Sequence, residues 1–249
     1  RIAKQPFGCL AAANGSARTG RLRRRRRMVR SIRGVVRGSE RDFLLFLIAG
    51  VFLGIAQSVD GSTINNYLKE HIGMMILERS ALELPRELPG LLVVLTIGSL
   101  SFLGSDVRIS AVANVLAAVG MFCLGIIPPQ YALVVVTIFV YSMGQHIFMP
   151  LSGSIGMSFA EYGGMGKILG KLSAAGNIAV VASSAALWAL YKFFHIRFST
   201  AFMIGAVSFL VAAVLLGCIR STQTVRVRQR LVYRKEYRLY YWLSMLYGA

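Results

Sequence analysis

Long apolar runs separated by short polar segments dominate the middle of the chain. The first run is Phe43–Ile64, and about 20 mostly apolar residues suffice to cross a bilayer as a helix. Five further runs follow: Ser80–Gly104, Ile109–Ile127, Tyr131–Phe159, Leu172–Phe194 and Ser199–Ile219. In lipid the backbone polar groups of each run must be satisfied internally, which favours helices. The pattern predicts an all-α integral membrane protein whose residues 43–219 form a six-helix transmembrane bundle.

Two junctions carry recognisable helix signals. Ser80 and Glu83 have the spacing of a capping box, which predicts that the second helix begins at Ser80. Pro128 and Pro129 end the third helix and leave a three-residue connection to the fourth. The third and fourth helices are therefore expected to be antiparallel neighbours.

The flanks differ sharply from this core. Residues 1–42 are basic, with an arginine run at 23–27, and are predicted to form a disordered cytoplasmic tail. Met28 is a natural start, so 1–27 is interpreted as an upstream extension that is not native; a transit peptide is the alternative. Residues 220–238 form a second basic segment, and 239–249 resemble the start of a seventh span. Eleven residues cannot cross a bilayer, so the natural protein is expected to be longer.

The charge distribution follows the same division. The chain of 249 residues is 55% hydrophobic and 15% charged, with a net charge of +18 and a mean hydropathy of +0.61. Most basic residues lie in the flanks, which argues against nucleic-acid binding and for contact with anionic lipid. Segments that lie inside when the N-terminus is cytoplasmic hold 23 of the 28 Lys and Arg residues, and the outer loops hold Lys69, Arg79, Arg86, Lys192 and Arg197. This asymmetry predicts a cytoplasmic N-terminus.

The first span carries the sharpest candidate for chemistry. Asp60 shares a helical face with Gln57, and an ionisable group within a span usually faces a bundle interior or a water-filled cavity. The two side chains are therefore candidates for binding a substrate or a proton. The alternative is that the helix leaves the membrane at Asp60, whose carboxylate is then solvated. Gly50 and Gly54, at a spacing of four residues, favour close helix packing.

Other polar residues lie inside the later runs. Gln145 and His146 fall in the fourth helix, where His146 is a candidate proton relay or a histidine bonded to a neighbouring carbonyl. Asn114 and Asn177 are predicted to form interhelical hydrogen bonds, with substrate contact as the second possibility. Three scattered cysteines indicate neither a zinc site nor disulfides, and no cofactor motif is present.

An intramembrane protease is the enzyme function that compares with these binding functions. The stretch 153–156 is superficially similar to the Gly-x-Ser segment of rhomboid intramembrane proteases, with Ser154 in the place of the nucleophile. That chemistry needs a histidine in the sixth helix, and the sixth run has none. A protease is therefore disfavoured, and the chain is not expected to be an enzyme.

Six spans, a basic linker and the start of a seventh span resemble the N-terminal half of a major facilitator superfamily transporter of a bacterial branch. A marker of that family is a loop between helices 2 and 3 of the form Gly-x-Leu-Ser/Ala-Asp-Arg-x-Gly-Arg/Lys. Here Asp106 and Arg108 match part of it, while the second glycine and the basic ending are missing. The resemblance covers residues 43–249.

The resemblance implies twelve helices in two bundles, with the C-terminal half following this chain. A small solute would bind between the bundles and cross the plasma (inner) membrane by alternating access. Helices 1 and 4 would line the cavity, which strengthens the prediction that four of their residues bind substrate or a proton: Gln57, Asp60, Gln145 and His146. We expect proton- or ion-coupled transport with Asp60 or His146 as the titrating group. The alternative is a membrane binding or scaffold protein that moves nothing.

Overall fold

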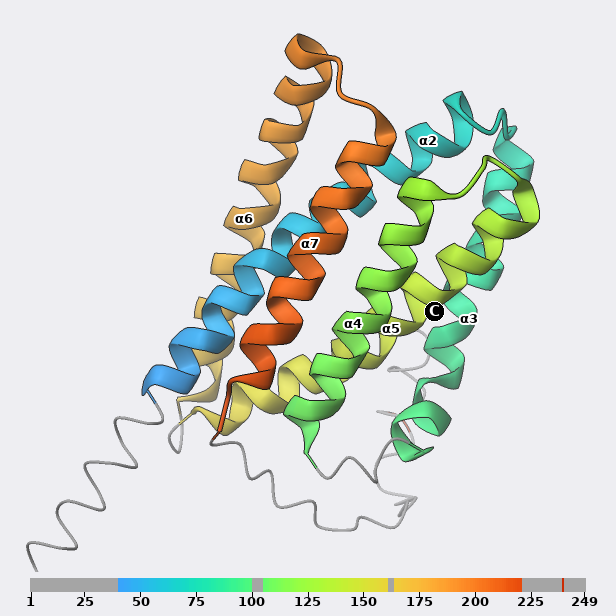
Figure 1. Ribbon diagram of the computed structural model, residues 1–249. Coiled ribbons are helices and arrows are strands. Elements are labelled where there is room, and N and C mark those ends of the chain that lie inside the picture. Colours follow the sequence, from blue (N-terminus) through green and yellow to red (C-terminus); the bar gives the residue numbers. More distant parts are fainter. Residues whose placement is uncertain (1–39, 100–104, 161–163, 221–238, 240–249) are drawn as a thin grey trace, which may run out of the picture.

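The computed structural model describes residues 40–99, 105–160, 164–220 and 239, which are helical with short connections and contain no strand (Figure 1). The first helix extends from Glu40 to Glu70 and comprises residues 40–59, a π-helical turn η1 (Asp60–Ile64) and α2 (Asn65–Glu70). It is followed by α3 (Ile76–Ser99), α4 (Asp106–Ile126), α5 (Tyr131–Ser158), α6 (Met165–Phe194) and α7 (Phe198–Gly217).

Five of these helices are long and apolar enough to span a membrane: the first helix, α4, α5, α6 and α7. Their number and character indicate a membrane protein. The remaining predicted span, the second along the chain, corresponds to α3, which carries more charge: Glu78, Arg79, Glu83, Arg86 and Glu87. Its predicted end, at 100–104, lies outside the described residues.

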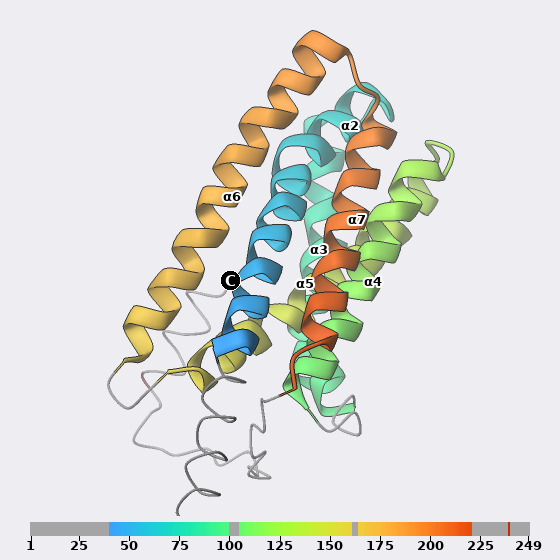
Figure 2. The same cartoon turned by 60° about the vertical axis from the view of Figure 1, so that its left-hand side comes forward.

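The helices pack into one bundle. α4 lies against both α5 and α7, α3 packs on α5, and η1 contacts α7. Figures 1 and 2 both show α6 at the edge of the bundle beside the first helix. Among the residues of α6, only Ala179 and Leu187 are buried, whereas α4 and α7 bury a residue at almost every turn.

The close contact of α4 with α5 confirms the predicted antiparallel pair. Small residues allow it: a Cβ placed on Gly120 would lie 2.5 Å from the backbone nitrogen of Tyr141. Gly54 has the same role for the first helix, since its Cβ would lie 2.6 Å from the carbonyl oxygen of Gly176 in α6. The predicted packing role is therefore confirmed for Gly54, while Gly50 has open space beside it.

Two predicted helix starts are wrong. Residues 40–42, expected in the disordered tail, already belong to the first helix, and Asp42 is buried. α3 begins at Ile76 and not at Ser80, whose hydroxyl donates to the carbonyl of Ile76 at 2.9 Å. The carboxylate that caps this helix start is that of Glu78, which accepts a hydrogen bond from the backbone N–H of Met75 at 2.9 Å.

The predictions for most of the basic flanks concern residues outside the described ones. They include the tail up to residue 39, the interpretation of 1–27, the basic segment 221–238 and the seventh span at 240–249.

Candidate functional site

A cavity of about 380 Å³ opens between the first helix, α3, α4, α5 and α7. Its lining includes four charged or titratable side chains from three helices: Asp60, Arg86, Glu87 and His146. Polar neutral side chains complete it: Gln57, Asn114, Ser142, Gln145 and Ser152. Polar groups from four helices thus meet at one place, and α7 adds the apolar ring of Phe209.

Asp60 lies at the start of the π-helical turn of the first helix. Its carboxyl group is buried, with 8% of the residue exposed, and the helix continues beyond it to Glu70. The solvated carboxylate that the alternative expects is therefore not found at Asp60. Single π turns inside α-helices occur often at functional sites, and here the turn begins at the buried carboxylate.

Arg86 of α3 is the cation that faces Asp60. Its Nη2 lies 3.0 Å from Asp60 Oδ2, and its Nη1 lies 3.3 Å from Oε1 of Glu83, one turn earlier in α3. The carbonyl of Arg86 accepts a hydrogen bond from the hydroxyl of Ser142 in α5. Tyr141 of α5 is fully buried near the same carboxyl, and neither its hydroxyl nor Asp60 Oδ1 has a hydrogen-bond partner among the described residues. Arg86 therefore connects the first helix, α3 and α5.

The second charged pair of the cavity joins α3 to α5. Nε2 of His146 lies 3.4 Å from Oε2 of Glu87, and this contact is ionic when the imidazole is protonated. Gly90 makes room for the ring, since a Cβ there would lie 3.0 Å from His146 Nδ1. The predicted carbonyl partner of His146 is replaced by a carboxylate.

The structure brings four predicted site residues into this cavity: Gln57, Asp60, Gln145 and His146. Asn114 also lines it, but its amide donates to the carbonyl of Ser110 at 2.8 Å within α4. Among the described residues, Asn114 therefore forms a hydrogen bond within its own helix and none to another helix.

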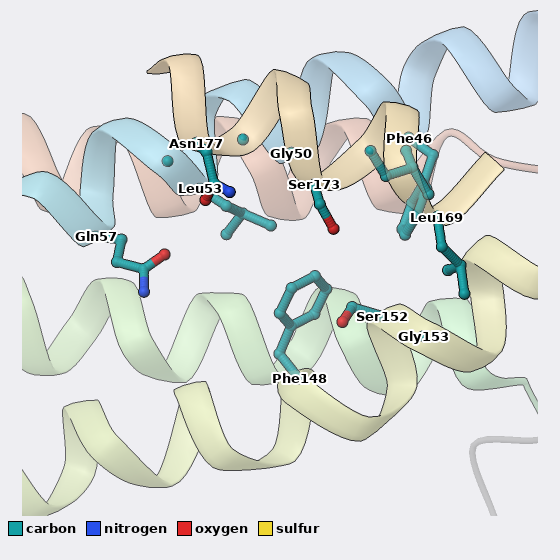
Figure 3. A pocket seen from close by; sticks show the side chains of 13 residues that line it. Phe46, Gly50, Leu53, Gln57, Phe148, Ser152, Gly153, Leu169, Ser173 and Asn177 are labelled. Carbon is teal, nitrogen blue, oxygen red and sulfur yellow. The ribbon is translucent and has the colours of Figure 1, made fainter. Parts of the chain in front are cut away.

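A neighbouring cavity of about 350 Å³ lies between the first helix, α5 and α6 (Figure 3). Asn177 is found here, together with Ser173 of α6 and Phe148 of α5. Gln57 lines both cavities and so connects them. The interhelical hydrogen bond predicted for Asn177 does not form within the described part of the chain.

Asp106 and Arg108 lie away from both cavities, in the first turn of α4. The prediction that they belong to the connecting loop is wrong, because Ser105 is the N-cap of α4 and its Oγ accepts from the N–H of Arg108 at 3.2 Å. The hydroxyl of Ser154 in α5 donates to Asp106 Oδ2 at 3.0 Å. Ser154 is the candidate nucleophile of the disfavoured protease, and its hydroxyl instead joins α5 to α4.

Sequence reasoning missed Arg86 and Glu87 as site residues and assigned Arg86 to an outer loop. Glu83, Arg86 and Glu87 recur at the spacing of one helical turn within a predicted span. That spacing was a usable signal, because charges inside a span need partners in the bundle.

Comparison with known proteins adds no family. No family model matches the chain, and neither a curated protein nor a solved structure matches it. Within the described ranges, no group of three or more His, Cys, Asp or Glu side chains could hold a metal ion. The chemistry of the site is therefore interpreted from the two cavities themselves.

Proposed function

We propose that the chain is the N-terminal half of a secondary active transporter of the major facilitator type, which moves a small solute across the plasma membrane. The observation that carries the proposal is the charged cavity. Buried ionisable residues in membrane helices are costly and usually mark substrate or proton pathways. Here the side chains of Asp60, Arg86 and His146 are only 10%, 24% and 20% exposed, and they face one cavity together with the more exposed Glu87.

The two pairs support proton coupling as part of this proposal. Protonation of Asp60 would release Arg86, and deprotonation of His146 would remove its ionic contact with Glu87. Each event changes a contact of α3, with the first helix in one case and with α5 in the other. Uptake measured with and without an imposed proton gradient tests this step, and uptake that ignores the gradient in both directions rules it out.

The topology of the proposal is the one that the basic residues favour. The N-terminus and the 220–238 segment face the cytoplasm, where both contact anionic lipid. A C-terminal half would supply the opposite wall of the cavity. The first helix and α5 correspond to helices 1 and 4 of such a half, and both line the charged cavity.

Alternating access can be tested without knowing the solute. In the protein as its host produces it, with the native cysteines replaced by alanine, we would introduce Ser152→Cys, which lines both cavities. A charged, membrane-impermeant thiol reagent is then applied to proteoliposomes from either side. A transporter exposes the cavity alternately, so the thiol should react from both sides.

Val119→Cys is the control, because Val119 is an exposed apolar residue of α4 outside both cavities. It should react from neither side if it faces lipid. Reaction of Ser152→Cys from one side only would overturn the transporter proposal and favour a membrane binding or scaffold protein.

A further inference from the structure

The cavity between the first helix, α5 and α6 differs from its charged neighbour in one respect. Its lining contains no charged side chain and consists of carboxamides, hydroxyls, apolar groups and glycines. Burying an ionic solute against neutral groups alone is unfavourable unless the charge is paired. The lining therefore favours an uncharged ligand.

The polar groups of this cavity are free to bind one. Within the part of the chain that the structure describes, the side chains of Gln57, Asn177 and Ser173 make no hydrogen bond. Figure 3 shows Gln57 of the first helix and Asn177 and Ser173 of α6 directed toward the space that Phe148 of α5 enters from the opposite wall. The hydroxyl of Ser152 donates a hydrogen bond to the carbonyl oxygen of Met149 at 2.7 Å, and its oxygen can still accept one from a ligand.

These groups match a particular chemistry. A carboxamide presents a donor and an acceptor side by side, and this arrangement pairs with the polar edge of a nucleobase. An aromatic ring stacks on the base face irrespective of base identity. Gln57 and Asn177 supply two carboxamides, Phe148 supplies the ring, and Ser152 and Ser173 supply hydroxyl groups suited to a sugar.

We propose that this cavity binds an uncharged solute of the nucleoside class. The inference rests on the proposed transport function and assigns its substrate. The volume of about 350 Å³ lies at the lower end of the range for small-molecule sites, about 300–1,000 Å³, and suits a solute of this size. The charged cavity, which shares Gln57 with this one, would then bind the coupled proton.

Gly50 offers a way to fill the cavity without disturbing the helices. It lines the cavity, and a Cβ on it has nothing within 4 Å. The side chain of Gly50→Leu would therefore occupy the ligand space. Gly170→Leu is the matched control, since Gly170 of α6 also has nothing within 4 Å but does not line the cavity.

The experiment measures equilibrium binding of radiolabelled uridine and adenosine to purified protein in lipid nanodiscs. Uridine monophosphate and adenosine monophosphate serve as charged competitors. We expect the neutral nucleosides to bind the wild type and Gly170→Leu equally, and Gly50→Leu at least about tenfold more weakly. The monophosphates should compete poorly. Asn177→Leu removes one carboxamide and should also weaken binding.

Three results would overturn the assignment: no binding of either nucleoside, equal binding by Gly50→Leu, or stronger binding of the monophosphates. Competition by glucose in place of nucleosides would identify a polyol site and also overturn it. The two-sided reactivity of Ser152→Cys needs no nucleoside, so failure here leaves the transporter proposal to be judged separately.

Discussion

Arg86 is the residue at which three helices of the bundle meet. Its guanidinium pairs with Asp60 of the first helix, and its backbone carbonyl accepts from Ser142 of α5. The side chain is 24% exposed and that of Asp60 only 10%. In so shielded a place each charge depends on the other, because the loss of one partner leaves an uncompensated buried ion.

The pair should therefore show strong thermodynamic coupling. We expect Arg86→Met to lower the free energy of unfolding by about 3–5 kcal/mol, the usual cost of removing one partner of a buried pair. The double variant Asp60→Asn/Arg86→Met should regain most of that loss, since it buries no lone charge. Thermal unfolding of the purified protein in detergent measures both.

Glu83→Gln is the control for this cycle. Glu83 contacts the same guanidinium, but its side chain is 52% exposed, and exposed pairs contribute about 0–1 kcal/mol. Its replacement should shift unfolding only slightly. Purely additive losses in the double variant would mean that Asp60 and Arg86 do not depend on each other.

The sequence allowed half of this site to be predicted. Asp60, Gln57, Gln145 and His146 stand out as polar residues in long apolar runs, and the structure places all four on one cavity. Their partners were harder to find, because the pairing of Arg86 with Asp60 joins residues that are far apart in the chain. Helical periodicity places residues on a face but does not say which helix that face meets.

At the scale of the elements, the bundle depends on small residues where α4 and α5 cross. A Cβ on Gly144 would contact the carbonyl of Ala113 and lie 2.5 Å from the backbone nitrogen of Ala117. Gly120 of α4 approaches the backbone of Tyr141 equally closely. Such contacts let two backbones pack directly, as small residues do in membrane helices.

Gly144→Leu should therefore force the two helices apart. Overpacking commonly costs about 1–3 kcal/mol, and here the clash is with backbone atoms that cannot rotate away. We expect a lower unfolding temperature and a smaller yield of monodisperse protein in size-exclusion chromatography. Gly153→Leu in the same helix has nothing within 4 Å of its Cβ and should behave like the wild type. If the two variants have the same unfolding temperature and the same yield, α4 and α5 do not need this close contact for stability.

The ends of a helix could be predicted where prolines mark them. They could not be predicted where a side-chain hydrogen bond sets the first residue of the helix. The third and fourth predicted helices match α4 and α5 closely, because two prolines stop one and precede the other. α3 starts earlier than its serine suggested, since Glu78 satisfies the N–H of Met75. The sequence indicated only the capping box of Ser80 and Glu83, because Met75 is not a residue type that caps a helix through its side chain.

At the scale of the whole molecule, α3 decides the topology. It has 24 residues, about 36 Å at 1.5 Å per residue, which exceeds the roughly 30 Å of a hydrocarbon core. Figures 1 and 2 show α3 extending along the bundle beside the other helices. Its charges need not oppose insertion, because Arg86 faces Asp60 and Glu87 faces His146. We therefore infer that α3 crosses the membrane as a sixth span.

Two connections distinguish six spans from five. If α3 crosses, the connection before it and the connection between α4 and α5 lie on the same side of the membrane. If α3 does not cross, they lie on opposite sides. Met75→Cys reports the first connection and Gln130→Cys the second, and both residues are exposed in the structure.

We would label each variant, lacking the native cysteines, with an impermeant maleimide on intact and on permeabilised cells. With six spans and a cytoplasmic N-terminus, both thiols react in intact cells, while Ser158→Cys at the far end of α5 reacts only after permeabilisation. If Met75→Cys and Gln130→Cys are labelled from opposite sides, α3 does not cross the membrane. The ionic contacts of Arg86 and Glu87 would then belong to a helix that enters the bundle without traversing the bilayer. The cavity would lose the membrane surroundings that make its charges costly, and with them the main argument for transport.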